Sequence, residues 1–121
     1  MDTIDLEYTD VFEDNKIKRL SFSSFLIKEE YKIASLFALQ VDGHSMEPVI
    51  NHKALVIADL SNKTLIDEKI YIVYHDNKMW IKKYIKSDDS FISINPKYSH
   101  LVYKVQDVHL VARVLLTFTN L

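Results

Sequence analysis

The chain uses glycine once, which restricts where its backbone can turn sharply. Gly43 is the only glycine among 121 residues, and Pro48 is one of two prolines. Both lie in the stretch 41–48, on either side of Ser45. Glycine is needed where φ is positive or where another group approaches closely, and proline suits the first turn of a helix. We therefore expect a strand over 37–41, a tight turn at Gly43 and a short helical turn at Pro48.

Ser45 has two roles open to it in such a bend. The bend exposes its hydroxyl and leaves backbone N–H groups of the following turn unpaired, which is an arrangement that can bind an oxyanion. The simpler alternative is that Ser45 is an N-cap, with Pro48 closing the turn. The residue pattern alone leaves both interpretations open.

Length and composition indicate one globular domain. A chain of 121 residues has the usual length of a single domain with a sizeable core. The net charge of −2 provides no basic face for nucleic acid. The absence of cysteine excludes disulfides, zinc thiolates and cysteine nucleophiles.

No metal or cofactor is predicted, because the histidines lack ligand spacing. They are His44, His52, His75, His100 and His109. The acidic start has no apolar core of a signal peptide, and no apolar run approaches the ~18–20 residues of a membrane span. We expect a cytoplasmic protein without a membrane partner.

Short apolar runs between polar turns predict a mainly β fold. The expected strands are 37–41, 54–58, 69–75, 78–86, 91–94 and 108–118. Asp76 and Asn77 predict a hairpin turn between two of them, and a strand within 18–23 is also compatible with the pattern. We expect a coiled, barrel-like antiparallel sheet with few short helical turns.

The first residues are strongly acidic. Residues 1–16 contain six carboxylates and Lys16 as the only base. This composition predicts a solvated, poorly ordered arm or linker over 1–19, followed by a folded domain over 20–121.

A lysine is the candidate base for Ser45, because a serine hydroxyl needs a base to become nucleophilic. Lys82 and Lys83 lie in an apolar strand, and burial there would favour the neutral amine. Alternation puts the two lysines on opposite faces without indicating which one points inward. Solvent exposure of both, on an edge strand, is the competing interpretation.

Four segments together resemble a known family. Residues 43–48 carry the G-x-S-M-x-P box, 79–84 resemble the V-K-R-L strand, 92–98 resemble S-x-N-P-x-Y, and 110–114 resemble the closing strand. In this order and spacing, over about residues 20–118, the chain resembles the peptidase domains of LexA, UmuD and phage repressors.

The resemblance implies a serine peptidase with a Ser–Lys dyad. Ser45 would be the nucleophile, Lys82 the general base, and the Ser45 amide an oxyanion donor, while Met46 would shape the cleft and Gly43 and Pro48 the turn. It further implies self-cleavage that relieves transcriptional repression, a homodimer through the C-terminal strands, and stimulation by a RecA filament. Operator DNA would be bound only by a helix-turn-helix domain absent from this sequence.

Some features depart from the family pattern. The usual scissile Ala-Gly or Cys-Gly is absent, since Gly43 follows Asp42. His52-Lys53 replaces a usual Gly-Asp, and His44 replaces an acidic residue; adjacency makes His44 a poor base for Ser45.

Three alternatives to a self-cleaving repressor domain remain. One is a catalytically silent dimerisation domain, one a free-standing UmuD-like protein, and one a β-barrel binding module that matches by chance. Arg113, inside an apolar strand, is expected at a sheet edge or a dimer face.

Overall fold

The computed structural model describes residues 2–121, which leaves Met1 outside the described residues. The described strands are β1 (Thr3–Asp10), β2 (Lys16–Ser23), β3 (Leu36–Gln40), β4 (Leu55–Asp59), β5 (Ile70–His75), β6 (Lys78–Ile85), β7 (Ser90–Ile92), β8 (Tyr103–Lys104) and β9 (His109–Phe118). Three-residue 3₁₀ helices occur at Ser24–Leu26, Ile33–Ser35, Lys86–Asp88, Pro96–Tyr98 and Val105–Asp107. The predicted mainly β fold is confirmed. Within residues 2–121 no helix has the length and apolar character needed to cross a membrane.

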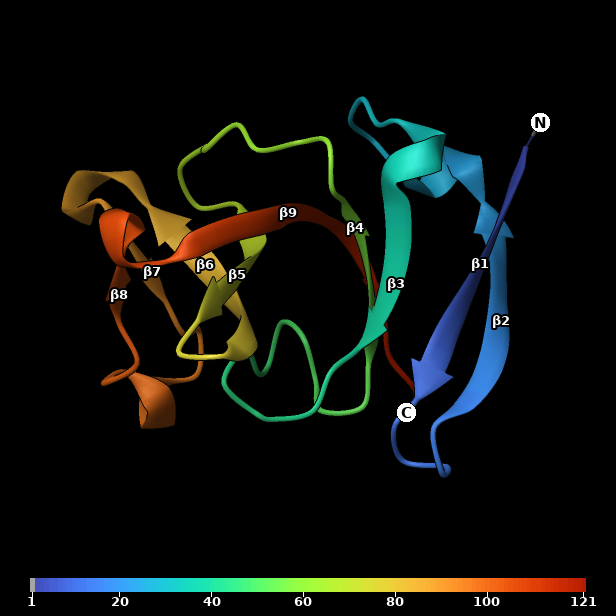
Figure 1. Ribbon diagram of the computed structural model, residues 1–121, viewed down its shortest axis with the longest axis horizontal. Coiled ribbons are helices and arrows are strands. Elements are labelled where there is room, and N and C mark those ends of the chain that lie inside the picture. Colours follow the sequence, from blue (N-terminus) through green and yellow to red (C-terminus); the bar gives the residue numbers. More distant parts are fainter. Residues whose placement is uncertain (1) are drawn as a thin grey trace.

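The strands form two antiparallel sheets. β1 and β2 make a hairpin, and the other strands make one sheet in the order β3-β4-β9-β5-β6-β7-β8. β9 is the long strand that joins the β5–β8 side of the sheet to β4 (Figure 1). Its register shifts against β4 between Ile57 and Ala58, and against β5 between Ile72 and Val73. Such irregularities bend a strand, so the sheet curves along β9.

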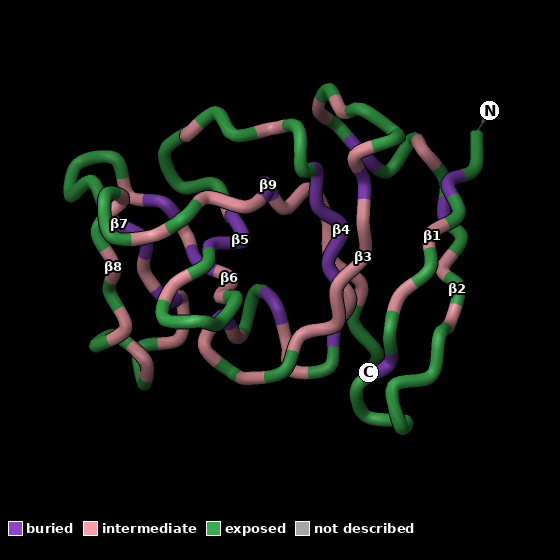
Figure 2. Tube along the Cα trace, in the orientation of Figure 1, coloured by how far each residue is buried: buried purple, intermediate pink, exposed green. Residues whose placement is uncertain are grey.

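β4 is apolar on both faces because each face packs against a different layer. Val56 and Ala58 belong to the main core cluster together with Met46 and Ile72. Ile57 points the other way, into a second cluster that includes residues of the β1–β2 hairpin. A strand that is covered on both faces has a continuous run of apolar residues in its sequence. Figure 2 shows β4 as buried along most of its length.

The expected disordered arm over the first residues is wrong. Residues 3–23 form the β1–β2 hairpin, which packs beside β3. Ile4, opposite Phe22, faces the protein, and both are buried. The carboxylates lie on the outer face or at the tip, where Glu7 meets Arg19 at 3.3 Å and Asp10 meets Lys18 at 2.8 Å. The acidic composition of β1 therefore masked the alternation of inward and outward side chains that is typical of a strand.

The two hairpin turns of this chain use Asp and Asn in place of glycine. Asp14 and Asn15 have φ values of 54° and 57° at the tip of the β1–β2 hairpin. Asp76 and Asn77 have φ values of 56° and 63° between β5 and β6, where a hairpin turn was predicted. Asp and Asn tolerate this left-handed region better than other side chains, so neither hairpin turn needs a glycine.

Arg113 was expected at a sheet edge or a dimer face, but it does not lie at an edge. It is only 5% exposed and lies in β9 between Asp59 of β4 and Tyr71 of β5. Its Nη2 donates to Glu29 Oε2 at 2.7 Å. Glu29 lies in the segment 27–35 that links the hairpin to β3, so the ion pair fastens this segment to the central strand.

Candidate active site

The stretch 41–54, here called the serine loop, connects β3 to β4. Val41 closes the base of the loop, because its N–H donates to Ala54 and its carbonyl accepts from Lys53, both at 2.8 Å. Gly43 has a φ of 138°, which side-chain-bearing residues rarely adopt, and a Cβ there would meet no atom within 4 Å. Position 43 therefore needs glycine for its backbone conformation and not for lack of space around a side chain.

A single turn follows Ser45, as predicted, but it does not extend into a helix within 46–54. The Ile50 N–H donates to the Met46 carbonyl at 3.0 Å, and the peptide between Glu47 and Pro48 is cis. Met46 is 2% exposed and belongs to the main core. Its packing in the core anchors the serine loop. Met46 also lines the cleft at Ser45.

Lys82 of β6 is fully buried. Burial lowers the pKa of its amine from 10.5 to about 8, because the charged form loses its hydration. The rings of Trp80 and Tyr103 lie 5.2 and 5.8 Å from Nζ. Nζ donates to Ser93 Oγ at 2.6 Å, so the amine is fixed in position as well as desolvated.

Lys83 faces the other side of β6. Its amine lies 3.8 Å from Glu68 Oε1, and its side chain is 30% exposed. The interpretation that both lysines are solvated is therefore wrong, since Lys82 is buried. Of the two, Lys82 has the environment that a neutral amine requires.

The segment 93–95 connects the serine loop to Lys82. Ser93 accepts the hydrogen bond from Lys82. Two residues later, the backbone N–H of Asn95 donates to the Ser45 carbonyl. The side-chain Nδ2 of Asn95 donates to the His44 carbonyl, and both distances are 2.9 Å. One short segment thus fixes both candidate catalytic residues relative to each other.

A cleft of about 290 Å³ opens beside Ser45. Its walls are residues 39–46 of β3 and the serine loop, residues 79–81 of β6, and Tyr98 and Leu101. Ser45 therefore shares a cleft with the three residues that precede Lys82. Within residues 2–121, the N–H groups of Ser45 and Met46 donate to no protein acceptor, which leaves them available to a bound group.

β6 presents a free edge at this cleft. It pairs with β7 only at Lys83, Tyr84 and Ile85. In the described chain, residues 79–82 have no strand partner on that side. An extended peptide can add to such an edge through main-chain hydrogen bonds.

His44 is engaged away from Ser45. Its Nδ1 lies 2.9 Å from Glu47 Oε1, and its side chain is about half exposed. The hydrogen bond from His44, followed by that from the His52 amide, holds the pKa of Glu47 below 4.5. A histidine as the base for Ser45 receives no support from this geometry.

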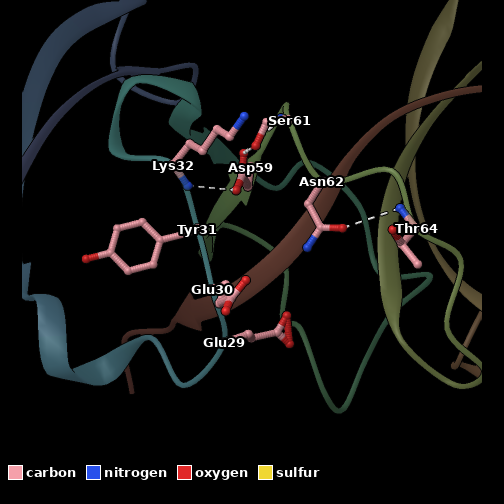
Figure 3. A pocket seen from close by; sticks show the side chains of 8 residues that line it. All are labelled: Glu29, Glu30, Tyr31, Lys32, Asp59, Ser61, Asn62 and Thr64. Atoms are coloured by element: carbon pink, nitrogen blue, oxygen red, sulfur yellow. Dashed lines mark hydrogen bonds between the residues drawn. The ribbon is translucent and has the colours of Figure 1, made fainter.

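A larger groove, of about 660 Å³, lies between residues 29–32 and the 59–64 loop and shares no lining residue with the cleft at Ser45 (Figure 3). Burial alone raises the pKa of Asp59, but hydrogen bonds from the Ser61 hydroxyl and amide and from the Lys32 amide outweigh it and hold the pKa below 3.8. Asp59 thus accepts hydrogen bonds from both walls of this groove. Ser45 lines the smaller cleft and not this groove.

Comparison with known proteins agrees with the mainly β fold. The family model described as Peptidase S24-like matches residues 5–115. The chain belongs to the Peptidase S24-like family, which includes the LexA, UmuD and phage-repressor peptidase domains. The matched region includes most of the β1–β2 hairpin. No curated protein matches the chain.

Proposed function

We propose that the chain is a serine endopeptidase in which Ser45 is the nucleophile and Lys82 the general base. The observation that carries this proposal is the buried Lys82 amine, with a pKa of about 8, held on the same 93–95 segment that holds Ser45. A lysine with this pKa is neutral in an appreciable fraction near neutral pH, which a base must be.

The reaction follows from these groups. The Lys82 amine takes the proton of Ser45 Oγ as the oxygen attacks the peptide carbonyl. The free N–H groups of Ser45 and Met46 stabilise the oxyanion. The leaving amine takes the proton from Lys82, and water then hydrolyses the acyl-enzyme. The free edge of β6 at 79–82 binds the peptide in an extended form.

The biological substrate is proposed to be the protein itself. By family resemblance, self-cleavage upstream of Ser45 would relieve repression of transcription. A RecA filament would stimulate it, and operator DNA would be bound by a helix-turn-helix domain that is not among these residues. No Ala-Gly or Cys-Gly occurs in this sequence, so the cleaved bond is of another type or lies outside the chain.

A fluorophosphonate probe tests the serine chemistry directly. Ser45 Oγ forms a bond to phosphorus, fluoride leaves, and Lys82 receives the proton. We expect mass spectrometry to find the adduct on Ser45 at pH 9, and none in Ser45→Ala. Incubating the full-length gene product from pH 7 to 10 then tests self-cleavage by mass. An unlabelled wild-type protein would contradict the peptidase proposal.

A catalytically silent dimerisation domain is the second candidate. The missing scissile dipeptide favours it. The homodimer would form through the C-terminal strand, because residues 114–117 of β9 line an open groove next to the exposed Val49. Concentration-dependent sedimentation together with an inert Ser45 would support this candidate.

Ser93 is expected to position the Lys82 amine. Ser93→Ala leaves the buried Nζ without its acceptor, so we expect acylation of Ser45 to slow about tenfold. Losing an acceptor disfavours the charged amine, so the midpoint of the pH–rate profile should move to lower pH. Ser93→Thr, which keeps the hydroxyl, should restore both quantities. An unchanged profile in Ser93→Ala would contradict this role.

A further inference from the structure

His52 lies within the serine loop and bonds to its only glycine. The Gly43 N–H donates to His52 Nδ1 at 2.9 Å. Gly43 precedes Ser45 by two residues and has the unusual φ of 138°. As an acceptor, Nδ1 must be unprotonated, so the neutral ring carries its proton on Nε2.

The imidazole ring is held from two sides. It stacks on His44, with ring centroids 4.5 Å apart and planes inclined by 26°. The Phe12 ring also contacts it edge-on, with ring centroids 5.1 Å apart and planes inclined by 80°. The backbone N–H of His52 also donates to Glu47 Oε2 at 3.3 Å. His52 therefore touches residues on both sides of Ser45.

Phe12 connects this contact to the β1–β2 hairpin. The neighbouring Val11 N–H donates to Gln40 Oε1 at 2.8 Å, at the end of β3, and Lys53 Nζ lies 5.0 Å from the Phe12 ring. The hairpin tip thus packs against the serine loop and restricts the His52 ring.

We infer that His52 is a positioning residue for Ser45: by accepting the Gly43 N–H while packed between His44 and Phe12, it fixes the backbone that carries the nucleophile. This inference rests on the proposed serine chemistry. Removing the acceptor frees Gly43 to change conformation, and a small displacement of a nucleophile slows a reaction that depends on near-attack geometry.

Two variants separate the acceptor from the ring. His52→Phe keeps an aromatic ring between His44 and Phe12 but has no acceptor. His52→Asn loses the ring and keeps an oxygen near the position of Nδ1. His109→Phe, at an exposed position in β9, is the matched control. The fold of each variant is checked by thermal unfolding.

Gly43 supplies a readout that does not depend on catalysis. Because it is the only glycine, labelling with ¹⁵N-glycine gives a single backbone amide signal in a two-dimensional NMR spectrum. We expect His52→Phe to shift this signal and to speed amide hydrogen exchange about tenfold. His52→Asn should stay close to wild type in exchange, and His109→Phe should not differ.

Fluorophosphonate acylation at pH 9 supplies the second readout. We expect His52→Phe to react about tenfold more slowly, and His52→Asn to recover most of the rate. Equal Gly43 exchange or equal acylation rates in His52→Phe and wild type would overturn the inference, as would equal losses in both His52 variants. A wild-type protein that is not acylated at all would overturn the peptidase proposal and the positioning role with it, while the Gly43 signal alone would still report whether the hydrogen bond exists.

Discussion

Lys82→Met should slow fluorophosphonate acylation of Ser45 about a thousandfold at pH 9. A general base contributes roughly 10²–10⁴-fold. The adjacent amine of Lys83 is not expected to replace that of Lys82, because it lies 3.8 Å from Glu68 Oε1 on the other side of β6. Methionine keeps the length and apolar stem of lysine in a site that is already fully buried, so the variant should fold.

The wild-type rate should depend on pH in a specific direction. Only the neutral amine can take a proton, and the Lys82 pKa is about 8. The rate should rise about tenfold per pH unit below pH 8 and level off above it, since about one-tenth of the amine is neutral at pH 7. A stopped-flow or mass-spectrometric time course from pH 6 to 10 measures this profile.

The same pKa predicts a change in stability that does not depend on activity. The folded amine has a pKa of about 8 against the ordinary 10.5, so between these values the unfolded chain retains a proton that the folded protein has lost. The free energy of unfolding should therefore rise with pH across this window by about 3 kcal/mol, at ~1.4 kcal/mol per pH unit. Lys82→Met should lack this increase.

Lys83→Met is the matched control for both measurements. Its amine is partly exposed and pairs with Glu68, so we expect acylation within about twofold of wild type and an unchanged stability profile. Equal acylation of Lys82→Met and wild type would contradict the role of Lys82 as base. A stability difference that stays constant with pH would contradict its lowered pKa.

The sequence allowed the strands and the two candidate catalytic residues to be predicted because local pattern carries them. The apolar runs at β4, β5 and β6 are bounded by polar turns, and the box at 43–48 identifies Ser45 without any tertiary information. Alternation also placed Lys82 and Lys83 on opposite faces of the strand. The burial of Lys82 in the structure was needed to show which of the two points inward.

The unpredicted features depend on contacts between distant residues. The β1–β2 hairpin was hidden by its carboxylates, although the spacing of Ile4, Leu6 and Tyr8 already has the period of a strand. Arg113 was assigned to an edge because its ion partner, Glu29, lies 84 residues away. The contact of Ser93 with Lys82, like that of His52 with Gly43, arises only when the loops fold onto the sheet.

Glu29→Gln should destabilise the protein by about 2–3 kcal/mol. The variant removes the negative charge from a 2.7 Å ion pair whose arginine is 5% exposed. A buried charge without its partner is expensive, and Arg113 Nε already lacks a hydrogen-bond partner in the described chain. Urea unfolding at pH 7 measures the loss. Glu7→Gln breaks an exposed pair with Arg19 in the hairpin, and we expect it to change stability by less than ~0.5 kcal/mol.

A double variant distinguishes the loss of an attraction from the cost of an unpaired charge. If the unpaired guanidinium causes the loss, then adding Arg113→Met to Glu29→Met should recover most of the stability, because no unpaired buried guanidinium then remains on β9. If the pair itself were the main source of stability, the double variant would be as unstable as Glu29→Met alone. A Glu29→Gln protein within ~0.5 kcal/mol of wild type would instead mean that the 27–35 segment is held to β9 by packing alone, and that Arg113 reaches water when Glu29 is lost.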